Sequence, residues 1–127
     1  MNPADLRYDK EHEWVRVEGD TAVIGISAFA QDQLGEVVYV DLPSVGEDLA
    51  AGETFGEIES VKSVSELFAP ISGAVVEVNE ELSASPETIN SDPYGAGWMV
   101  KVALSDAGQL DGLMSSGEYE SFVANEA

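Results

Sequence analysis

The sequence contains no cysteine and only one histidine, His12, among its 127 residues. Without thiols the chain cannot form disulfides, bind a metal through thiolates or use a cysteine nucleophile. A lone histidine does not supply the clustered ligands of a typical zinc site, so we expect no metal centre. Any sulfur chemistry must therefore come from an attached cofactor.

Basic residues are scarce as well. Five Lys and Arg residues stand against 25 Asp and Glu residues, which gives a formal net charge of -20. Because nucleic acids and anionic membrane surfaces are bound through clustered Lys and Arg, we expect neither as a partner. The charge instead favours solubility and attraction to basic patches on partner proteins.

Long apolar runs are also missing. No apolar stretch of about 18 residues occurs, and residues 1–9 lack the apolar core of a signal peptide, so we expect a cytoplasmic protein. Hydrophobic residues nevertheless make up 44% of the chain, which is enough to form a packed core. The length fits a single domain that spans residues 1–127.

The chain begins with a predicted β-hairpin. Residues 14–18 and 21–26 are rich in β-branched residues, and the two residues between them, Gly19 and Asp20, suit a tight turn. Ser27 is then well placed to cap a short helix near residues 28–34, which ends at Gly35.

Short β-prone runs separated by turn residues dominate the middle of the chain, at residues 37–40, 54–59, 64–69 and 74–78. Such spacing indicates a sandwich or a barrel. A final strand is expected at residues 98–104, after a loop at residues 86–97 that is rich in Pro, Gly, Asn, Ser and Asp.

The last part of the chain changes from a strand pattern to a helical one. Two short helices are predicted from apolar residues at helical spacing, the first with Leu110, Leu113 and Met114 and the second with Tyr119, Phe122 and Val123. We therefore predict a mainly β fold: a flattened barrel or sandwich of two antiparallel sheets at about residues 20–104, with a helical extension at residues 105–127.

Lys62 stands out because it lies between two β-prone runs, where a tight turn would expose its primary amine to a modifying enzyme. On this pattern alone, an ordinary exposed lysine remains the simpler interpretation. The two tryptophans, Trp14 and Trp98, are interpreted as core residues because their neighbours alternate as in buried strands.

The residues around Lys62 carry a resemblance. The segment Glu59-Ser-Val-Lys-Ser-Val-Ser-Glu66, followed by Ala69-Pro-Ile-Ser-Gly73, resembles the lipoylation segment of glycine cleavage H proteins. Biotin carriers resemble Ala-Met-Lys-Met at this point, and lipoyl domains of 2-oxoacid dehydrogenases often have Asp-Lys-Ala, so both fit less well. Further similarity to H proteins follows in order along nearly the whole chain, at residues 10–15, 25–26, 30–31, 34–38, 40–43, 89–94 and 97–101.

The resemblance implies a non-catalytic carrier, expected to be a monomer, with lipoate joined by an amide to Nζ of Lys62. The lipoyl arm of such a carrier takes an aminomethyl group from the P protein (glycine decarboxylase) to the T protein (aminomethyltransferase), and the L protein (dihydrolipoyl dehydrogenase) reoxidises it. Lipoylating enzymes are the other implied partners. Their candidate recognition residues are Glu59, Ser60, Val61, Ser63 and Glu66.

The resemblance also implies that the loaded arm folds into a cleft near the His-Glu-Trp segment. Glu13 and Glu66 are the candidates for contacting the amine end of the arm. Gln33 is a third cleft candidate, at a position where some H proteins have a histidine.

Two other functions stay open at this stage. One is a lipoyl reservoir that passes lipoate to other acceptor proteins without supporting glycine cleavage. The other is a hydrolase built around His12, although the sequence has no G-x-S-x-G turn.

Overall fold

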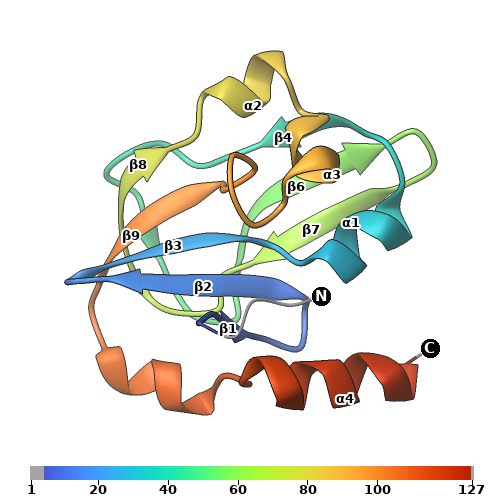
Figure 1. Ribbon diagram of the computed structural model, residues 1–127. Helices are drawn as coiled ribbons and strands as arrows, with labels where there is room; N and C mark the ends of the chain where they lie inside the picture. Colours follow the sequence, from blue (N-terminus) through green and yellow to red (C-terminus); the bar gives the residue numbers. More distant parts are fainter. Residues whose placement is uncertain (1–4, 127) are drawn as a thin grey trace.

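The computed structural model describes residues 5–126, and within this range nine strands form two antiparallel sheets (Figure 1). The larger sheet has the strand order β1-β2-β3-β9-β8-β5, and the smaller sheet has the order β4-β6-β7. The strands are β1 (Arg7–Tyr8), β2 (Glu13–Glu18), β3 (Thr21–Ile26), β4 (Val37–Asp41), β5 (Asp48–Leu49), β6 (Thr54–Ser60), β7 (Val64–Phe68), β8 (Gly73–Val78) and β9 (Val100–Leu104). The helices are α1 (Ala28–Leu34), α2 (Glu81–Ala84), α3 (Thr88–Ser91) and α4 (Ser116–Glu126), with a 3-10 helix, η1 (Ala107–Gly112).

The predicted first hairpin is confirmed. Glu18 pairs with Thr21 across a two-residue turn, where Gly19 has a φ of 64°. Farther along the same pair of strands, Trp14 lies opposite Gly25, and a Cβ at Gly25 would come within 2.6 Å of the indole ring. The missing side chain at Gly25 therefore makes room for Trp14.

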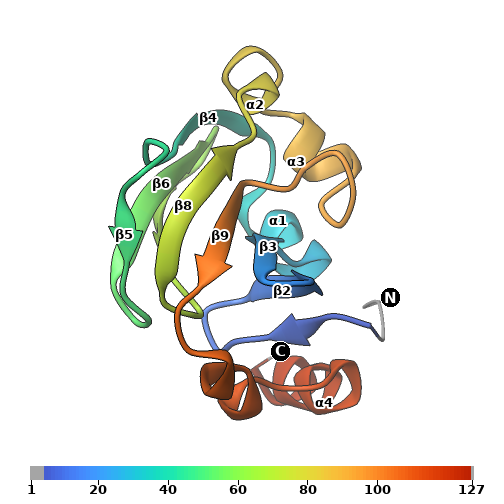
Figure 2. The same ribbon diagram turned by 90° about the vertical axis from the view of Figure 1, so that its left-hand side faces the viewer.

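The two sheets face each other across the main hydrophobic core. Figure 2 shows β8 and β9 of the larger sheet beside β6 and β4 of the smaller one. The core between them is formed largely by Val, Ile and Leu side chains from both sheets, including Ile24, Ile58 and Val102. The predicted pair of antiparallel sheets is thus confirmed, and since the described strands do not close into a barrel, the sandwich is the alternative that holds.

The outer face of the larger sheet is covered by the C-terminal helix α4, which lies alongside β1 and β2 in both views (Figures 1 and 2). Successive side chains of a strand point to opposite faces. Trp14 accordingly packs in a second apolar cluster with Tyr8 and Tyr119, whereas Val15 packs in the core between the sheets. The interpretation of Trp14 as a core residue is confirmed, and Trp98 packs partly buried against the same cluster.

Three sequence-based expectations need correction. The segment at residues 86–97 is not entirely loop, because α3 forms within it and buries Ile89 completely. The last strand begins at Val100 and not at residue 98. The first C-terminal helix is a 3-10 helix that ends at Gly112, and Met114 instead pairs with Tyr8 in a β-bridge. In each case contacts made in the folded protein outweigh the local pattern.

Candidate functional site: the Lys62 turn and the adjoining cleft

Lys62 lies at the tip of the hairpin between β6 and β7, as the sequence predicts. The turn is organised by Ser60, whose backbone N–H donates to the carbonyl of Ser63 (2.8 Å). The Oγ atom of Ser60 accepts hydrogen bonds from the backbone N–H groups of Lys62 (3.3 Å) and Ser63 (3.1 Å). A hydroxyl that binds the backbone in this way stabilises a tight turn. Ser60 thus fixes the backbone on which the exposed lysine stands.

The turn also touches the C-terminal end of α1. The N–H of Val61 donates to the carbonyl of Glu36 (3.0 Å). The aliphatic part of Lys62 lies over Gly35, because a Cβ built at Gly35 would be 3.3 Å from Cε of the lysine. The side chain is exposed, yet its outer atoms, Cδ, Cε and Nζ, lie close to Gly35 at the end of α1.

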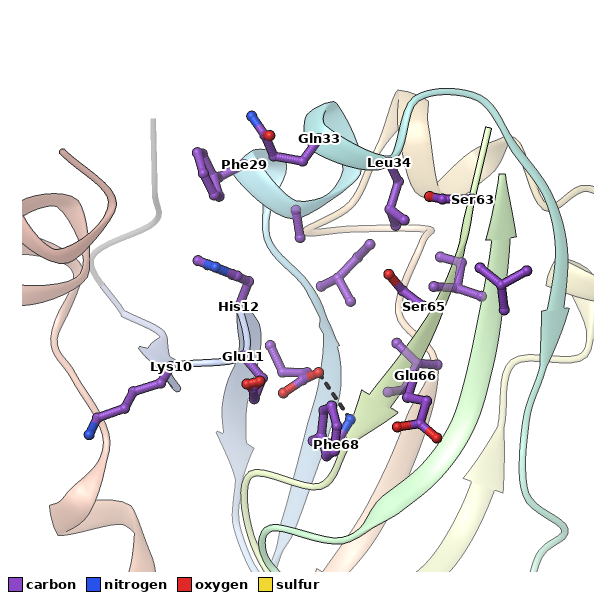
Figure 3. A pocket seen from close by; sticks show the side chains of 16 residues that line it. Lys10, Glu11, His12, Phe29, Gln33, Leu34, Ser63, Ser65, Glu66 and Phe68 are labelled. Atoms are coloured by element: carbon purple, nitrogen blue, oxygen red, sulfur yellow. Dashed lines mark hydrogen bonds between the residues drawn. The ribbon is translucent and has the colours of Figure 1, made fainter. Parts of the chain in front are cut away.

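A cleft of about 760 Å³ opens directly beside the turn (Figure 3). One wall comes from α1, with Phe29, Gln33 and Leu34, and the opposite wall comes from Ser63 and the following residues of β7. Residues 10–13 form its third side. Since Ser63 is part of the lining, the cleft begins one residue from Lys62.

Glu13 is the buried acid of this cleft, with 1% of its surface exposed. Its Oε2 atom accepts a hydrogen bond from the N–H of Phe68 (3.1 Å), which is the dashed line in Figure 3, and Oε1 has no hydrogen-bond partner among the described residues. Burial, reinforced by the nearby carboxylate of Asp9, raises the pKa of Glu13 to about 11, although the N–H of Phe68 opposes this shift. The raised pKa of Glu13 therefore favours the protonated form of this buried acid, next to the side chain of Asp9.

Asp9 is a residue that the sequence analysis missed. Its Oδ1 atom accepts hydrogen bonds from the N–H groups of Glu11 (3.0 Å) and Glu13 (2.9 Å), and it thereby shapes the turn that leads into β2. Within this turn His12 has a φ of 71°, which is uncommon for a residue other than glycine. An Asp that opens a turn is a recognisable signal, but nothing in the sequence shows that it lies beside Glu13.

His12 takes part in a buried network. Its Nδ1 atom hydrogen-bonds with the hydroxyl of Tyr119 (2.8 Å), and the same hydroxyl hydrogen-bonds with Oγ of Ser27 (2.6 Å). Ser27 is fully buried, and its Oγ accepts the N–H of Ala30 as the predicted cap of α1. The hydroxyl of Ser27, the serine beside His12, therefore caps helix α1, and this structural role argues against the hydrolase interpretation.

The structure brings the three cleft candidates together around one cavity, with Glu13 buried and Gln33 and Glu66 exposed at its edge. The recognition candidates Ser60, Val61 and Ser63 surround Lys62. Glu59 pairs with Val64 on the neighbouring strand and is not among the residues that line the cleft.

Two other kinds of site are absent from residues 5–126. In this part of the chain, no group of three His, Cys, Asp or Glu side chains is arranged to hold a metal ion. Of the helices described, none is long and apolar enough to cross a membrane.

Comparison with protein families gives a match along almost the whole chain. The family model described as "Glycine cleavage H-protein" matches residues 6–126. The chain is 58% identical to the glycine cleavage system H protein of Symbiobacterium thermophilum, covering 95% of this chain and 94% of that protein. It is 52% identical to the protein of the same name from Carboxydothermus hydrogenoformans, with 98% and 95% covered.

A solved structure shows the same architecture. The crystal structure of a glycine cleavage system H protein from Mycobacterium marinum superimposes with a TM-score of 0.89, at 42% sequence identity. The match covers 97% of this chain and 99% of that one. Similarity in sequence and in fold thus extends over almost the whole chain.

Proposed function

This chain belongs to the glycine cleavage H-protein family, and we propose from this membership that it acts as the lipoyl-carrying shuttle of the glycine cleavage system, with Lys62 as the attachment residue. The observation that carries the proposal is the placement of an exposed lysine at a hydrogen-bonded turn, one residue from a cleft with a buried acid. A carrier needs both the exposed lysine and the cleft. Its lipoyl arm must be accessible to several enzymes, and it must be protected from water while it passes from one enzyme to the next.

The residues present at the turn fit lipoate. Lys62 offers the primary amine that an amide requires, Ser60 holds its backbone N–H, and Gly35 leaves room for the outer part of its side chain. Lipoate joined to Lys62 would supply a disulfide, and with it the sulfur chemistry for uptake of the aminomethyl group at the P protein, its delivery at the T protein and reoxidation at the L protein. A tethered arm of this kind raises the effective concentration of its reactive end at each docked enzyme.

The proposed role of the cleft is to hold the amine end of the loaded arm away from water. Glu13 presents Oε1 as an unsatisfied acceptor, and a cation beside it would favour the ionised carboxylate, so the proton of Glu13 would leave for solvent. Gln33 and Glu66 add polar groups at the edge of the same cavity. Exclusion of water from the cleft would slow hydrolysis of the bound group.

The working form is proposed to be a monomeric, single-domain carrier located in the cytoplasm. That it has no catalytic activity of its own is proposed from the name of its relatives, glycine cleavage system H protein. Glu59, Ser60, Val61, Ser63 and Glu66 are proposed to guide the lipoylating enzyme to Lys62.

The test is a glycine–bicarbonate exchange assay with purified P protein and the lipoylated chain. We expect exchange that depends on the carrier and is absent with Lys62→Arg. Lipoylation of Lys62 without any exchange would contradict the shuttle and favour a lipoyl reservoir.

A further inference from the structure

The one-turn helix α3, within a segment expected to be loop, places Asn90 against the C-terminal end of α1 (Figure 1). The Nδ2 atom of Asn90 donates hydrogen bonds to the carbonyl of Gly35 (2.8 Å) and to Oε1 of Gln31 (2.9 Å). Its Oδ1 atom accepts the N–H of Val37 (2.8 Å). One carboxamide thus binds both sides of the short link between α1 and β4.

This link is the surface on which the Lys62 turn rests. It contains Glu36, whose carbonyl accepts the N–H of Val61, and Gly35, against which the side chain of Lys62 packs. The φ of Gly35 is 82°, a conformation that a residue with a side chain rarely adopts. The hydrogen bonds of Asn90 therefore hold this glycine-containing link in the position that meets the lysine turn.

We propose that Asn90 is a positioning residue for the carrier arm: by fixing residues 35–37, it sets the direction in which Lys62 leaves its turn, along the end of α1 and into the cleft. The inference rests on the proposed function of Lys62. A side chain with two donors and an acceptor is required at this point, because the two carbonyl oxygens and the backbone N–H all face position 90.

Asn90 is not needed to keep α3 on the protein. Ile89, the residue before it, is completely buried in the main core. The following loop is tied down by the indole N–H of Trp14, which donates to the carbonyl of Pro93 (3.0 Å). Removal of the carboxamide is therefore expected to loosen the link at residues 35–37 and leave α3 in place.

The variant is Asn90→Ala, and the structure offers a matched control in Asn79→Ala. Asn79 is also an asparagine with two donated hydrogen bonds to backbone carbonyls, those of Ala96 (2.9 Å) and Trp98 (2.7 Å). It is more deeply buried, with 5% exposed, and among the described residues its carboxamide donates only to these two carbonyls, which lie outside the Lys62 turn and its supporting link. Asn79→Ala should therefore lower the free energy of unfolding by a similar amount without altering the Lys62 turn.

The first readout is amide hydrogen exchange, which needs no lipoate. In Asn90→Ala we expect the amide of Val61 to exchange about tenfold faster, as lost hydrogen bonds predict, while amides of β2 and β3 stay protected. In Asn79→Ala the exchange of Val61 is expected to stay unchanged. Unchanged exchange of Val61 in a folded Asn90→Ala protein would overturn the proposal.

The second readout is the rate at which a loaded carrier loses its aminomethyl group without partner enzymes. We expect about a tenfold increase in Asn90→Ala and no increase in Asn79→Ala. Equal increases in both variants would mean that Asn90 has a structural role only.

If Asn90→Ala does not fold, Asn90→Asp keeps the acceptor for Val37 and loses both donors, and the same two readouts apply. If Lys62 proved not to be lipoylated, the proposed function would fail. The amide hydrogen exchange of Val61 would still show whether Asn90 holds the Lys62 turn in place.

Discussion

Glu13 lines the functional cleft, and burial of its carboxyl group lowers the stability of the fold. It is almost completely buried, and Oε1 finds no partner within the described part of the chain. Burial of a carboxyl group lowers the stability of a fold, because the charged form loses the solvation that it has in the unfolded chain. Such a cost is typical of groups kept for function, because natural proteins accept local instability where a ligand must bind.

The burial of Glu13 predicts a pH-dependent effect of Glu13→Gln. In the unfolded chain this carboxyl has an ordinary pKa of 4.5, whereas in the folded protein burial raises the pKa to about 11. The folded state therefore binds more protons between these values, so stability falls as pH rises through this window. The neutral Gln removes the effect, so we expect the stability advantage of the variant to grow between pH 5 and pH 8, by up to about 1.4 kcal/mol per pH unit, in urea unfolding.

The matched control is Glu66→Gln, which alters an exposed acid of the same cleft. Its stability should follow that of the unaltered protein, because an exposed carboxyl loses little solvation on folding. A Glu13→Gln protein whose stability gain did not change with pH would show that Glu13 is already ionised in the folded state.

The two acids near the base of the cleft differ in how far the sequence could predict them. Glu13 was identified as a cleft residue because it lies in a segment that resembles H proteins, and the structure does place it in the cleft. Asp9 was not identified, since its effect on Glu13 depends on a turn that brings the two side chains together. Proximity of this kind follows from backbone geometry and is not contained in residue spacing.

Among the elements, the C-terminal helix α4 is linked to the cleft by a chain of hydrogen bonds. The hydroxyl of Tyr119 binds both His12, beside Glu13, and Ser27, the cap of α1. The ring of Tyr119 also stacks on that of Tyr8, with ring centres 4.6 Å apart. Helix α4 thus stabilises two of the three sides of the cleft, the one formed by residues 10–13 and the one formed by α1.

We predict that Tyr119→Phe destabilises the protein by about 1–2 kcal/mol, or roughly 5 °C in Tm, because the hydroxyl is lost while the stacked ring is kept. Thermal unfolding followed by circular dichroism measures the change. Tyr39→Phe is the control, since the side chain of Tyr39 is 53% exposed and its loss of a hydroxyl should have little effect. Equal Tm values for the two variants would mean that the network does not support the fold.

Some elements could be predicted from local chemistry and others could not. The β2–β3 hairpin and helix α1 have clear local signals, a two-residue turn with glycine and a serine cap, and both form where expected. Helix α3 has no such signal, because its residues favour turns, and it forms around the buried side chain of Ile89. Contacts across the fold create this helix, and they also place Asn90 where no sequence pattern would put it.

At the scale of the whole molecule, the fold separates stability from function. The packed sheets and α4 provide a rigid body, and the β6–β7 hairpin lies at its edge (Figure 1). Lys62 is in the turn of this hairpin. The position of the lysine turn could be predicted from the sequence, because strand-forming residues flank it on both sides. The cleft could not, since its walls come from three segments that are separated in the chain and meet only in the folded protein.

The central claim is that Lys62 carries lipoate, and the most direct test is peptide mass spectrometry. The protein would be produced in cells supplied with lipoate and a lipoylating enzyme, together with Lys62→Arg and with Lys10→Arg, which alters another exposed lysine. We predict one lipoyl group, attached to Lys62, in the unaltered protein and in Lys10→Arg, and none in Lys62→Arg, because arginine lacks an amine that can be acylated. An unmodified Lys62, or lipoate on another lysine, would contradict the account.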